Sequence, residues 1–343
     1  MADITVRGAG IFGLSIAWAC VRRGADVRLI DPAGPASGAS GGILGALAPH
    51  VPETWNAKKA FQLDSLLMAR DWWDTVEAAG GVSPGYARRG RLQPVADTGA
   101  LALARQRADG ARSLWRGRAE WTVVPATGAA WEPASDGGFL VHDTLSAHLH
   151  PRRACLSLVA ALAAAGVTVA AEGADAGAVV WASGVAGLEA LNAGRPRSVG
   201  TGIKGQAALL DHDAVGQPQL FVDGVHVIPH LDGTVAVGAT TERDFGDPAA
   251  TDAKLDAVIA IARAHVPALR DARVLDRWAG VRPRSRSRAP ILGPWPGRPG
   301  HYVANGGFKI GFGMVPKVAE TLADLLLDGR DTIPDGFRVE DSF

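Results

Sequence analysis

A cluster of glycines near the start of the sequence is spaced in a way that suits a phosphate group. Gly8, Gly10 and Gly13 form a GxGxxG pattern between an apolar run at residues 4–7 and residues 14–23, whose apolar side chains recur at helical spacing. In such a loop the first glycine permits a tight turn, the second leaves room for a pyrophosphate against the backbone, and the third lets helix and strand pack closely. The N–H groups that begin the helix then face the phosphates.

An acidic residue follows where a nucleotide-binding unit requires one. A second predicted strand, residues 26–30, ends at Asp31, whose carboxylate can accept hydrogen bonds from ribose hydroxyls. Because strand, glycines, helix, strand and acid occur in order, the segment predicts a βαβ unit that binds a dinucleotide. The next loop, residues 37–42 (SGASGG), consists of small residues. A second stretch of backbone could approach the cofactor there, as FAD in an extended pose requires and NAD does not.

Four segments together resemble the D-amino-acid oxidase (DAO) family of flavoproteins, most closely the bacterial glycine oxidases. They are the GxGxxG unit with Asp31, GASGGILGA at 38–46, WAGVRP at 278–283 with PILG at 290–293, and ANGGFKIGF at 304–312. A weaker match joins HVIP at 226–229 to VGAT at 237–240. The resemblance implies an α/β fold: a Rossmann-like FAD-binding domain with an inserted α+β substrate domain rich in antiparallel strands.

The predicted α/β segments lie at the start, middle and end of the chain, which indicates a discontinuous domain. We expect residues 1–50, 142–200 and 281–343 to form the FAD-binding domain and residues 51–141 and 201–280 the substrate-binding domain. Apolar spacing predicts the longer helices at 61–79, 151–166, 252–265 and 316–327.

Position by position, the resemblance assigns many residues to FAD. They are Gly8, Gly10, Ile11, Phe12, Gly13, Asp31, Ala39, Ser40, Gly41, Gly42, Leu44, Gly184, Arg282, Gly306, Gly307, Phe308, Lys309, Ile310 and Gly311. The flavin is expected to be non-covalent, because neither residues 283–287 nor the loop before Gly41 holds a cysteine or histidine. No metal-ligating pattern occurs among the 2 cysteines of the chain.

Four residues are the candidates for substrate contact. Arg282 matches the arginine that pairs with a substrate carboxylate in the family, a task that suits the guanidinium fork. Lys309 stands where glycine oxidases have a second arginine, His226 where they have a tyrosine, and Thr241 where they have a methionine. A solvated or structural role for Lys309, and a structural one for His226, are the alternatives.

The predicted function is FAD-dependent oxidation of the C–N bond of a small amino acid or N-substituted amino acid. Hydride transfer to flavin N5 would give an imine that hydrolyses, with oxygen or another electron acceptor completing the cycle. The alternatives are an amino-acid or opine dehydrogenase that does not use oxygen, and a tRNA-modifying flavoprotein acting on a carboxymethylaminomethyl group.

Charge and composition bear on partners and location. Lysine plus arginine equals aspartate plus glutamate, at 35 each, which counts against nucleic acid as a partner. The basic runs at 282–288 and 112–118 are interpreted as solvated faces. The sequence shows no signal-peptide pattern at its start and no membrane-spanning run, so we expect a cytoplasmic enzyme without a membrane partner.

Overall fold

The N-terminal nucleotide-binding unit has the predicted order of elements. In the computed structural model, which describes residues 3–342, β1 (Asp3–Arg7), α1 (Ile11–Arg22) and β2 (Asp26–Ile30) follow one another directly. The helix begins three residues before the predicted residue 14, because Gly10 already serves as its N-cap. The two strands are parallel, with Val6 opposite Leu29.

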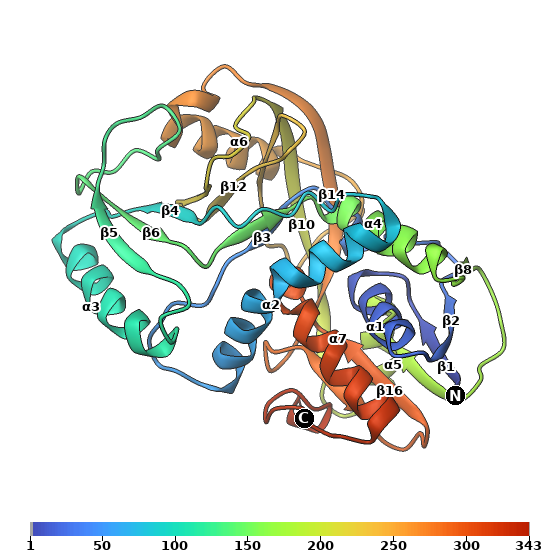
Figure 1. Ribbon diagram of the computed structural model, residues 1–343. Coiled ribbons are helices and arrows are strands. Elements are labelled where there is room, and N and C mark those ends of the chain that lie inside the picture. The colour runs from blue at the N-terminus through green and yellow to red at the C-terminus, as the bar shows by residue number, and fades with distance from the viewer. Residues whose placement is uncertain (1–2, 343) are drawn as a thin grey trace.

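A six-stranded sheet grows around this unit from distant parts of the chain. Its order is β15-β16-β9-β1-β2-β8, and all neighbours are parallel except β15 and β16. The added strands are β8 (Val169–Ala170), β9 (Ala178–Trp181), β15 (Ile291–Pro294) and β16 (His301–Asn305). The last part of the chain therefore completes the sheet that the first part begins (Figure 1).

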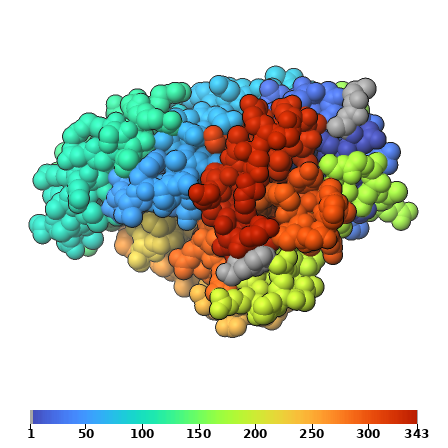
Figure 2. Space-filling view, turned by 90° about the horizontal axis from the view of Figure 1, so that it is seen from below, coloured from blue at the N-terminus to red at the C-terminus, as the bar shows by residue number. Residues whose placement is uncertain are grey.

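The half of the molecule that contains this sheet also holds the helices α1, α2 (Ala57–Gly80), α4 (Pro151–Ala164), α5 (Gly184–Asn192) and α7 (Gly311–Asp328). Helices α1, α2, α4 and α7 share the main hydrophobic core, whereas Leu188 and Leu191 of α5 belong to a separate cluster. Leu14, Trp73 and Leu322 are among the fully buried members of the main core. Helix α7 packs on both α1 and α2, and Figure 2 shows the red C-terminal residues lying beside blue N-terminal ones.

A second sheet of eight strands forms the other half of the molecule, in the order β14-β10-β13-β12-β11-β4-β6-β5. Its strands are β4 (Arg91–Pro94), β5 (Trp121–Pro125), β6 (Phe139–Asp143), β10 (Gly200–Asp211), β11 (Gln219–Val222), β12 (Val225–Pro229), β13 (Thr234–Gly238) and β14 (Arg273–Ser285). Neighbours are antiparallel except β4 and β11. This mixed α/β architecture confirms the predicted fold class.

The remaining elements cover or connect the two sheets. Helix α3 (Thr98–Leu114) packs on β5, and α6 (Ala253–His265) covers one face of the larger sheet (Figure 1). Strands β3 (Gly45–Leu47) and β7 (Ala147–Leu149) form a small sheet, and η1 (Ala39–Gly41), η2 (Pro267–Leu269) and η3 (Glu340–Ser342) are single 3₁₀ turns. No helix within residues 3–342 is long and apolar enough to cross a membrane.

Two details differ from the sequence-based expectations. Strand β14 extends to Ser285, so the run at 282–288, interpreted as a solvated face, begins inside a long β-ladder. Helix α3 ends at Leu114, and a turn takes up most of the second basic run. Helix α2 lies within the predicted segment 51–141 yet packs on α4 and α7, so the exact domain boundaries stay a prediction.

The face of the larger sheet that turns away from α6 meets the glycine-rich loop of the smaller half. Val227 and Val235 pack with α6, so their neighbours His226 and Gly238 point to the opposite face. On that face a Cβ at Gly238 would lie 2.9 Å from Leu44 Cδ2, and one at Gly42 would lie 3.2 Å from the Trp278 ring. The predicted cofactor and substrate residues thus meet between the two sheets.

Candidate active site

The first loop leaves no room for side chains at two of its glycines. Gly8 has a φ of +112°, and a Cβ there would lie 2.4 Å from the carbonyl oxygen of Ala182. A Cβ at Gly13 would lie 1.8 Å from the Gly8 carbonyl oxygen, because the helix crosses directly over the turn. The predicted roles of these glycines, a tight turn and close packing of helix on strand, therefore follow from their surroundings.

The N-terminus of α1 offers backbone donors to an anion. Gly10 caps it without a side-chain hydrogen bond, and no acidic residue lies in the first turn. Ser40 Oγ accepts from the Ile11 amide at 3.0 Å, which ties the second glycine-rich loop to this helix end. The neighbouring N–H groups lack intrahelical partners and lie at the positive end of the helix dipole. Such a cradle fits the pyrophosphate of a dinucleotide.

Asp31 holds the loop as well as occupying the predicted ribose position. Its Oδ2 accepts from the Ala9 amide at 2.7 Å, and its Oδ1 accepts from the Ala33 amide at 3.0 Å. Each carboxylate oxygen has a second lone pair, so these bonds leave acceptor capacity for a ribose hydroxyl. The bond to Ala9 spans 22 residues and was not expected from the sequence.

A third set of contacts fixes the loop at 38–42. A Cβ at Gly41 would lie 2.2 Å from the Ala36 carbonyl oxygen, so the chain folds back on itself there. Arg152, at the start of α4, donates from Nε to the Gly41 carbonyl at 3.1 Å and from its amide to the Gly42 carbonyl at 3.2 Å. Sequence reasoning missed Arg152, because nothing in Pro-Arg-Arg marks a contact with a loop 111 residues earlier.

The C-terminal glycine segment forms the opposite wall of the cradle. Buried Asn305 accepts from the Gly306 amide at 2.7 Å and donates to the Gly184 carbonyl at 2.8 Å, which joins two segments assigned to the cofactor. A Cβ at Gly307 would lie 2.9 Å from the Phe12 ring. Helix α7 then begins at Gly311 without a side-chain cap and without an acid in its first turn. Its positive end suits the negative charge that develops on a reduced flavin.

Arg282 projects from β14 on the same face as Gly205 and Gly280. Its Nη2 donates to the Thr240 carbonyl at 2.7 Å and to the Lys204 carbonyl at 3.3 Å, whereas its buried Nε has no partner among the described residues. A Cβ at Gly205 would lie 2.1 Å from Nη2, so glycine is required for this placement. Burial lowers the pKa of Arg282 to about 10, which leaves it charged at neutral pH.

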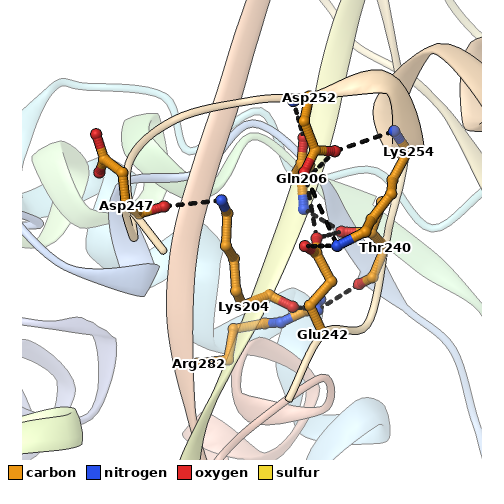
Figure 3. Close-up of polar contacts among 8 residues, drawn as sticks. All are labelled: Lys204, Gln206, Thr240, Glu242, Asp247, Asp252, Lys254 and Arg282. Carbon is orange, nitrogen blue, oxygen red and sulfur yellow. Dashed lines mark hydrogen bonds and ion pairs between the residues drawn. The ribbon is translucent and has the colours of Figure 1, made fainter. Parts of the chain in front are cut away.

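A polar network lies behind Arg282 (Figure 3). Glu242 is 7% exposed and accepts from Gln206 Nε2 at 2.9 Å and from the Thr240 hydroxyl, while its other oxygen pairs with Lys254 at 2.8 Å. Burial alone would raise the pKa of Glu242, but these hydrogen bonds bring it below its ordinary value. The carboxylate therefore stays charged, and its field favours the charged form of Arg282.

Three of the four candidate substrate residues lie near one another. The Arg282 guanidinium carbon is 5.4 Å from the centroid of the Phe308 ring, and Lys309 Nζ is 5.8 Å from it. The pKa of His226 is lowered to about 3 by burial and then by the charges of Arg91 and Lys309. His226 is thus a neutral group, and its Nδ1 has no partner among residues 3–342.

Thr241 differs from these three. Its own side chain is exposed, although its neighbours Thr240 and Glu242 are buried, and no hydrogen bond of its side chain is found among the described residues. Its neighbour Thr240 contacts Arg282 through the backbone carbonyl. The other positions predicted for FAD, including Ala39, Leu44 and Ile310, border the cradle through the loops just described.

Comparison with known families agrees with this arrangement. The family model described as FAD dependent oxidoreductase (DAO) matches residues 3–325, which is nearly the whole chain. The chain belongs to this family. The sequence-based prediction of a DAO-family, FAD-dependent oxidoreductase is confirmed.

Individual proteins are similar to this chain in sequence or in structure. A Rhizobium etli protein named as the thiamine biosynthesis oxidoreductase ThiO is 32% identical over 344 residues, covering 94% of this chain and 96% of that protein. A glycine oxidase of Pseudomonas aeruginosa is 34% identical over 134 residues, 39% of this chain and 36% of the oxidase. The crystal structure of an iminodiacetate oxidase from Chelativorans sp. is similar in fold, with a TM-score of 0.86, 22% identity and 98% coverage of both chains.

Short motifs reveal some of the candidate site residues and miss others. Glycines and Asp31 lie in local motifs, and Arg282 lies in the matching Gly-Val-Arg-Pro segment. Gly205, Gln206 and Glu242 were missed, since they act through a ladder that joins strands far apart in sequence. Their only sequence signal is a set of polar residues inside an otherwise apolar β-rich region.

Proposed function

We propose that this enzyme oxidises the C–N bond of a small amino acid or N-substituted amino acid whose carboxylate binds Arg282. The observation that carries the proposal is the half-buried guanidinium of Arg282. Its Nη2 is held by two backbone carbonyls, while Nε is buried without a partner. An unmatched buried donor is unfavourable unless a ligand accepts from it, and a carboxylate is the acceptor that a guanidinium binds best.

The chemistry that bound FAD supplies is acceptance of a hydride from the substrate α-carbon, which leaves an imine that hydrolyses in water. Arg282 would fix the carboxylate, and with it the orientation of the α-hydrogen. The N–H groups at the start of α7 and at Gly307 would stabilise negative charge in the cofactor. His226, neutral at working pH, would line the pocket as a polar group and would not act as a cation.

The names of most relatives support a small amine. The glycine oxidase and the iminodiacetate oxidase are named for small amino acids. A Polaromonas naphthalenivorans protein named for tRNA 5-methylaminomethyl-2-thiouridine biosynthesis is also similar, at 29% identity over 94% of this chain, but the chain covers only 56% of that protein. The tRNA-modifying alternative is disfavoured by the charge balance of 35 basic and 35 acidic residues. The cytoplasmic location and the two-domain boundaries given by the sequence remain part of this proposal.

The test is a screen of the purified yellow protein with amino acids and N-substituted glycines. Loss of the oxidised flavin spectrum under anaerobic conditions identifies substrates, and peroxide formation in air shows whether oxygen is the acceptor. Bleaching without peroxide would identify a dehydrogenase that uses another acceptor. If no small amine bleaches the flavin while dithionite does, the proposed substrate class is wrong.

A further inference from the structure

A groove of about 630 Å³ lies at the end of the β10–β14 ladder and is lined by four arginines. Arg197, Arg243, Arg284 and Arg286, called here the arginine groove, share it with Thr201 and a few small residues. No aspartate or glutamate lines it. A concave surface of this volume is the size of a small-molecule site.

Two of the four groove arginines, Arg284 and Arg286, belong to the arginine-rich run at the end of β14. Arginine occurs at 282, 284, 286 and 288, and the β-ladder continues past Ser285 because the Arg286 amide donates to the Val199 carbonyl at 2.8 Å. Alternate residues of a strand share a face, so Arg284 points with Arg282. Ser285, between Arg284 and Arg286, is buried and also borders the groove. The sequence alone led us to interpret residues 282–288 as a solvated face. The structure pairs Arg282 and Arg284 with β10, so both side chains lie on one face of a β-ladder.

Arg284, which lines the groove, lies two residues along β14 from Arg282. Arg284 is opposite Thr201 and Arg282 is opposite Ile203, which puts all four on one face of the β10–β14 pair. The guanidinium carbons of Arg282 and Arg284 lie 5.4 and 5.7 Å from the centroid of the same Phe308 ring. Two residues of a strand span roughly 7 Å, which is close to the distance between the outermost oxygens of an extended four-carbon dicarboxylate.

The charges in the groove have no counterpart in the described part of the chain. None of its four arginines forms an ion pair with a carboxylate there, whereas Arg91 is paired with buried Asp143 and Arg107 with Glu53. Four guanidinium groups around one hollow repel one another unless an anion lies between them. Their planar donors suit carboxylate or phosphate oxygens.

We propose that the arginine groove binds a second anionic group of the molecule whose carboxylate binds Arg282. The inference rests on the proposed function, and it makes the substrate an amino acid or N-substituted amino acid with a distal carboxylate or phosphate-type oxyanion. Glycine fills only the Arg282 end of this site. The groove then selects substrates by charge, through contacts that lie beyond the reacting carbon.

The test compares propionate, succinate and 3-phosphonopropionate, which share a carboxylate and differ at the far end. Each is titrated into the FAD-loaded protein, with binding followed by the change in the visible flavin spectrum. We expect both two-anion ligands to bind at least about tenfold more tightly than propionate, since charge-assisted pairs at the groove add to the shared contact. The stronger of the two shows whether the distal group is a carboxylate or a phosphate.

The matched variants are R243A/R286A and, as a control, R270A, an exposed arginine outside the groove. The double variant should lose the advantage of the two-anion ligands and keep its affinity for propionate, whereas R270A should behave as wild type. Equal binding of all three ligands by wild type would overturn the proposal. So would an advantage that survives in the double variant, or binding of a tRNA probe without any preference for a second anion. These titrations measure binding and need no turnover. Failure of the amine screen would therefore contradict the proposed function without deciding whether the arginine groove binds a second anion.

Discussion

Replacing Arg282 with alanine tests the proposed function most directly. The Arg282 side chain is half-buried. Burial lowers its pKa and the charge of Glu242 raises it, so the guanidinium stays charged in a place from which water is partly excluded. Truncating one partner of a buried, hydrogen-bonded charge pair costs about 2–5 kcal/mol, much of it from leaving the other charge unpaired. Since each 1.4 kcal/mol is a factor of ten, kcat/KM should fall by roughly 30-fold to a few thousand-fold.

The assay compares an amino acid with the amine obtained by removing its carboxylate. Wild type should strongly prefer the acid, and Arg282→Ala should lose most of that preference because its activity on the amine changes little. Arg282→Lys should recover only part of the loss, since one ammonium group cannot bond the Thr240 carbonyl and also offer a fork to the substrate. Flavin content and thermal stability are measured in parallel, because Arg282 also bonds two backbone carbonyls.

A second variant tests the position of the Arg282 guanidinium without removing its charge. Gly205→Ala keeps the guanidinium but places a Cβ 2.1 Å from its Nη2, so Arg282 must move. We expect this variant to lose preference for the acid as Arg282→Ala does, while retaining its FAD. If Arg282→Ala folds, holds FAD and still prefers the acid as strongly as wild type, the carboxylate is bound elsewhere and the reasoning is refuted.

Three further predictions concern Asp31, the attachment of the flavin and the buried side chain of His230. Asp31→Ala should lower FAD affinity, because the Ala9 amide and a ribose hydroxyl both lose their acceptor; an equilibrium titration with unchanged affinity would contradict this. Acid precipitation should release the flavin into the supernatant, whereas colour retained in the pellet would indicate a covalent bond. Burial, followed by the charge of His150, lowers the pKa of His230 to about 3 in the folded protein. Below about pH 6.5, His230 therefore stays neutral in the folded protein but binds a proton when the protein unfolds. The free energy of unfolding should fall between pH 6.5 and 3, by about 2 kcal/mol from this group at pH 5, and denaturant curves for His230→Gln should show a weaker dependence on pH.

The fold of the N-terminal nucleotide-binding unit and the use of FAD could be predicted from the sequence because their signals are mostly local. A turn, a helix start and a strand end lie within residues 3–31, and Gly13 packs on Gly8 of the same loop, although Gly8 itself also packs on the distant Ala182. The steric reason is visible at Gly13, where no larger residue fits over Gly8. The start of α7 was placed five residues late, at 316, because Pro316 resembles a helix start although it lies inside the helix.

The substrate half was predicted less completely, because its geometry depends on long-range pairing. Arg282 is placed by carbonyls 42 and 78 residues away and by the absence of a side chain at Gly205, and no pattern within β14 reports either fact. Glu242 likewise looks like any surface acid until β10 and the segment after β13 bring Gln206 and Lys254 to it.

The arginine run at 282–288, which begins in β14, shows that one sequence pattern can indicate either a solvated face or a binding surface. Four arginines at alternate positions predict a charged face on a strand, and an isolated charged face is most often solvated. The ladder with β10 changes that expectation, because it turns Arg282 toward the pocket and Arg284 toward the groove, with Phe308 between them. If both arginines contact one ligand, their spacing along the strand sets the distance between its two anionic groups. Substrate length would then be fixed by the repeat of a β-strand.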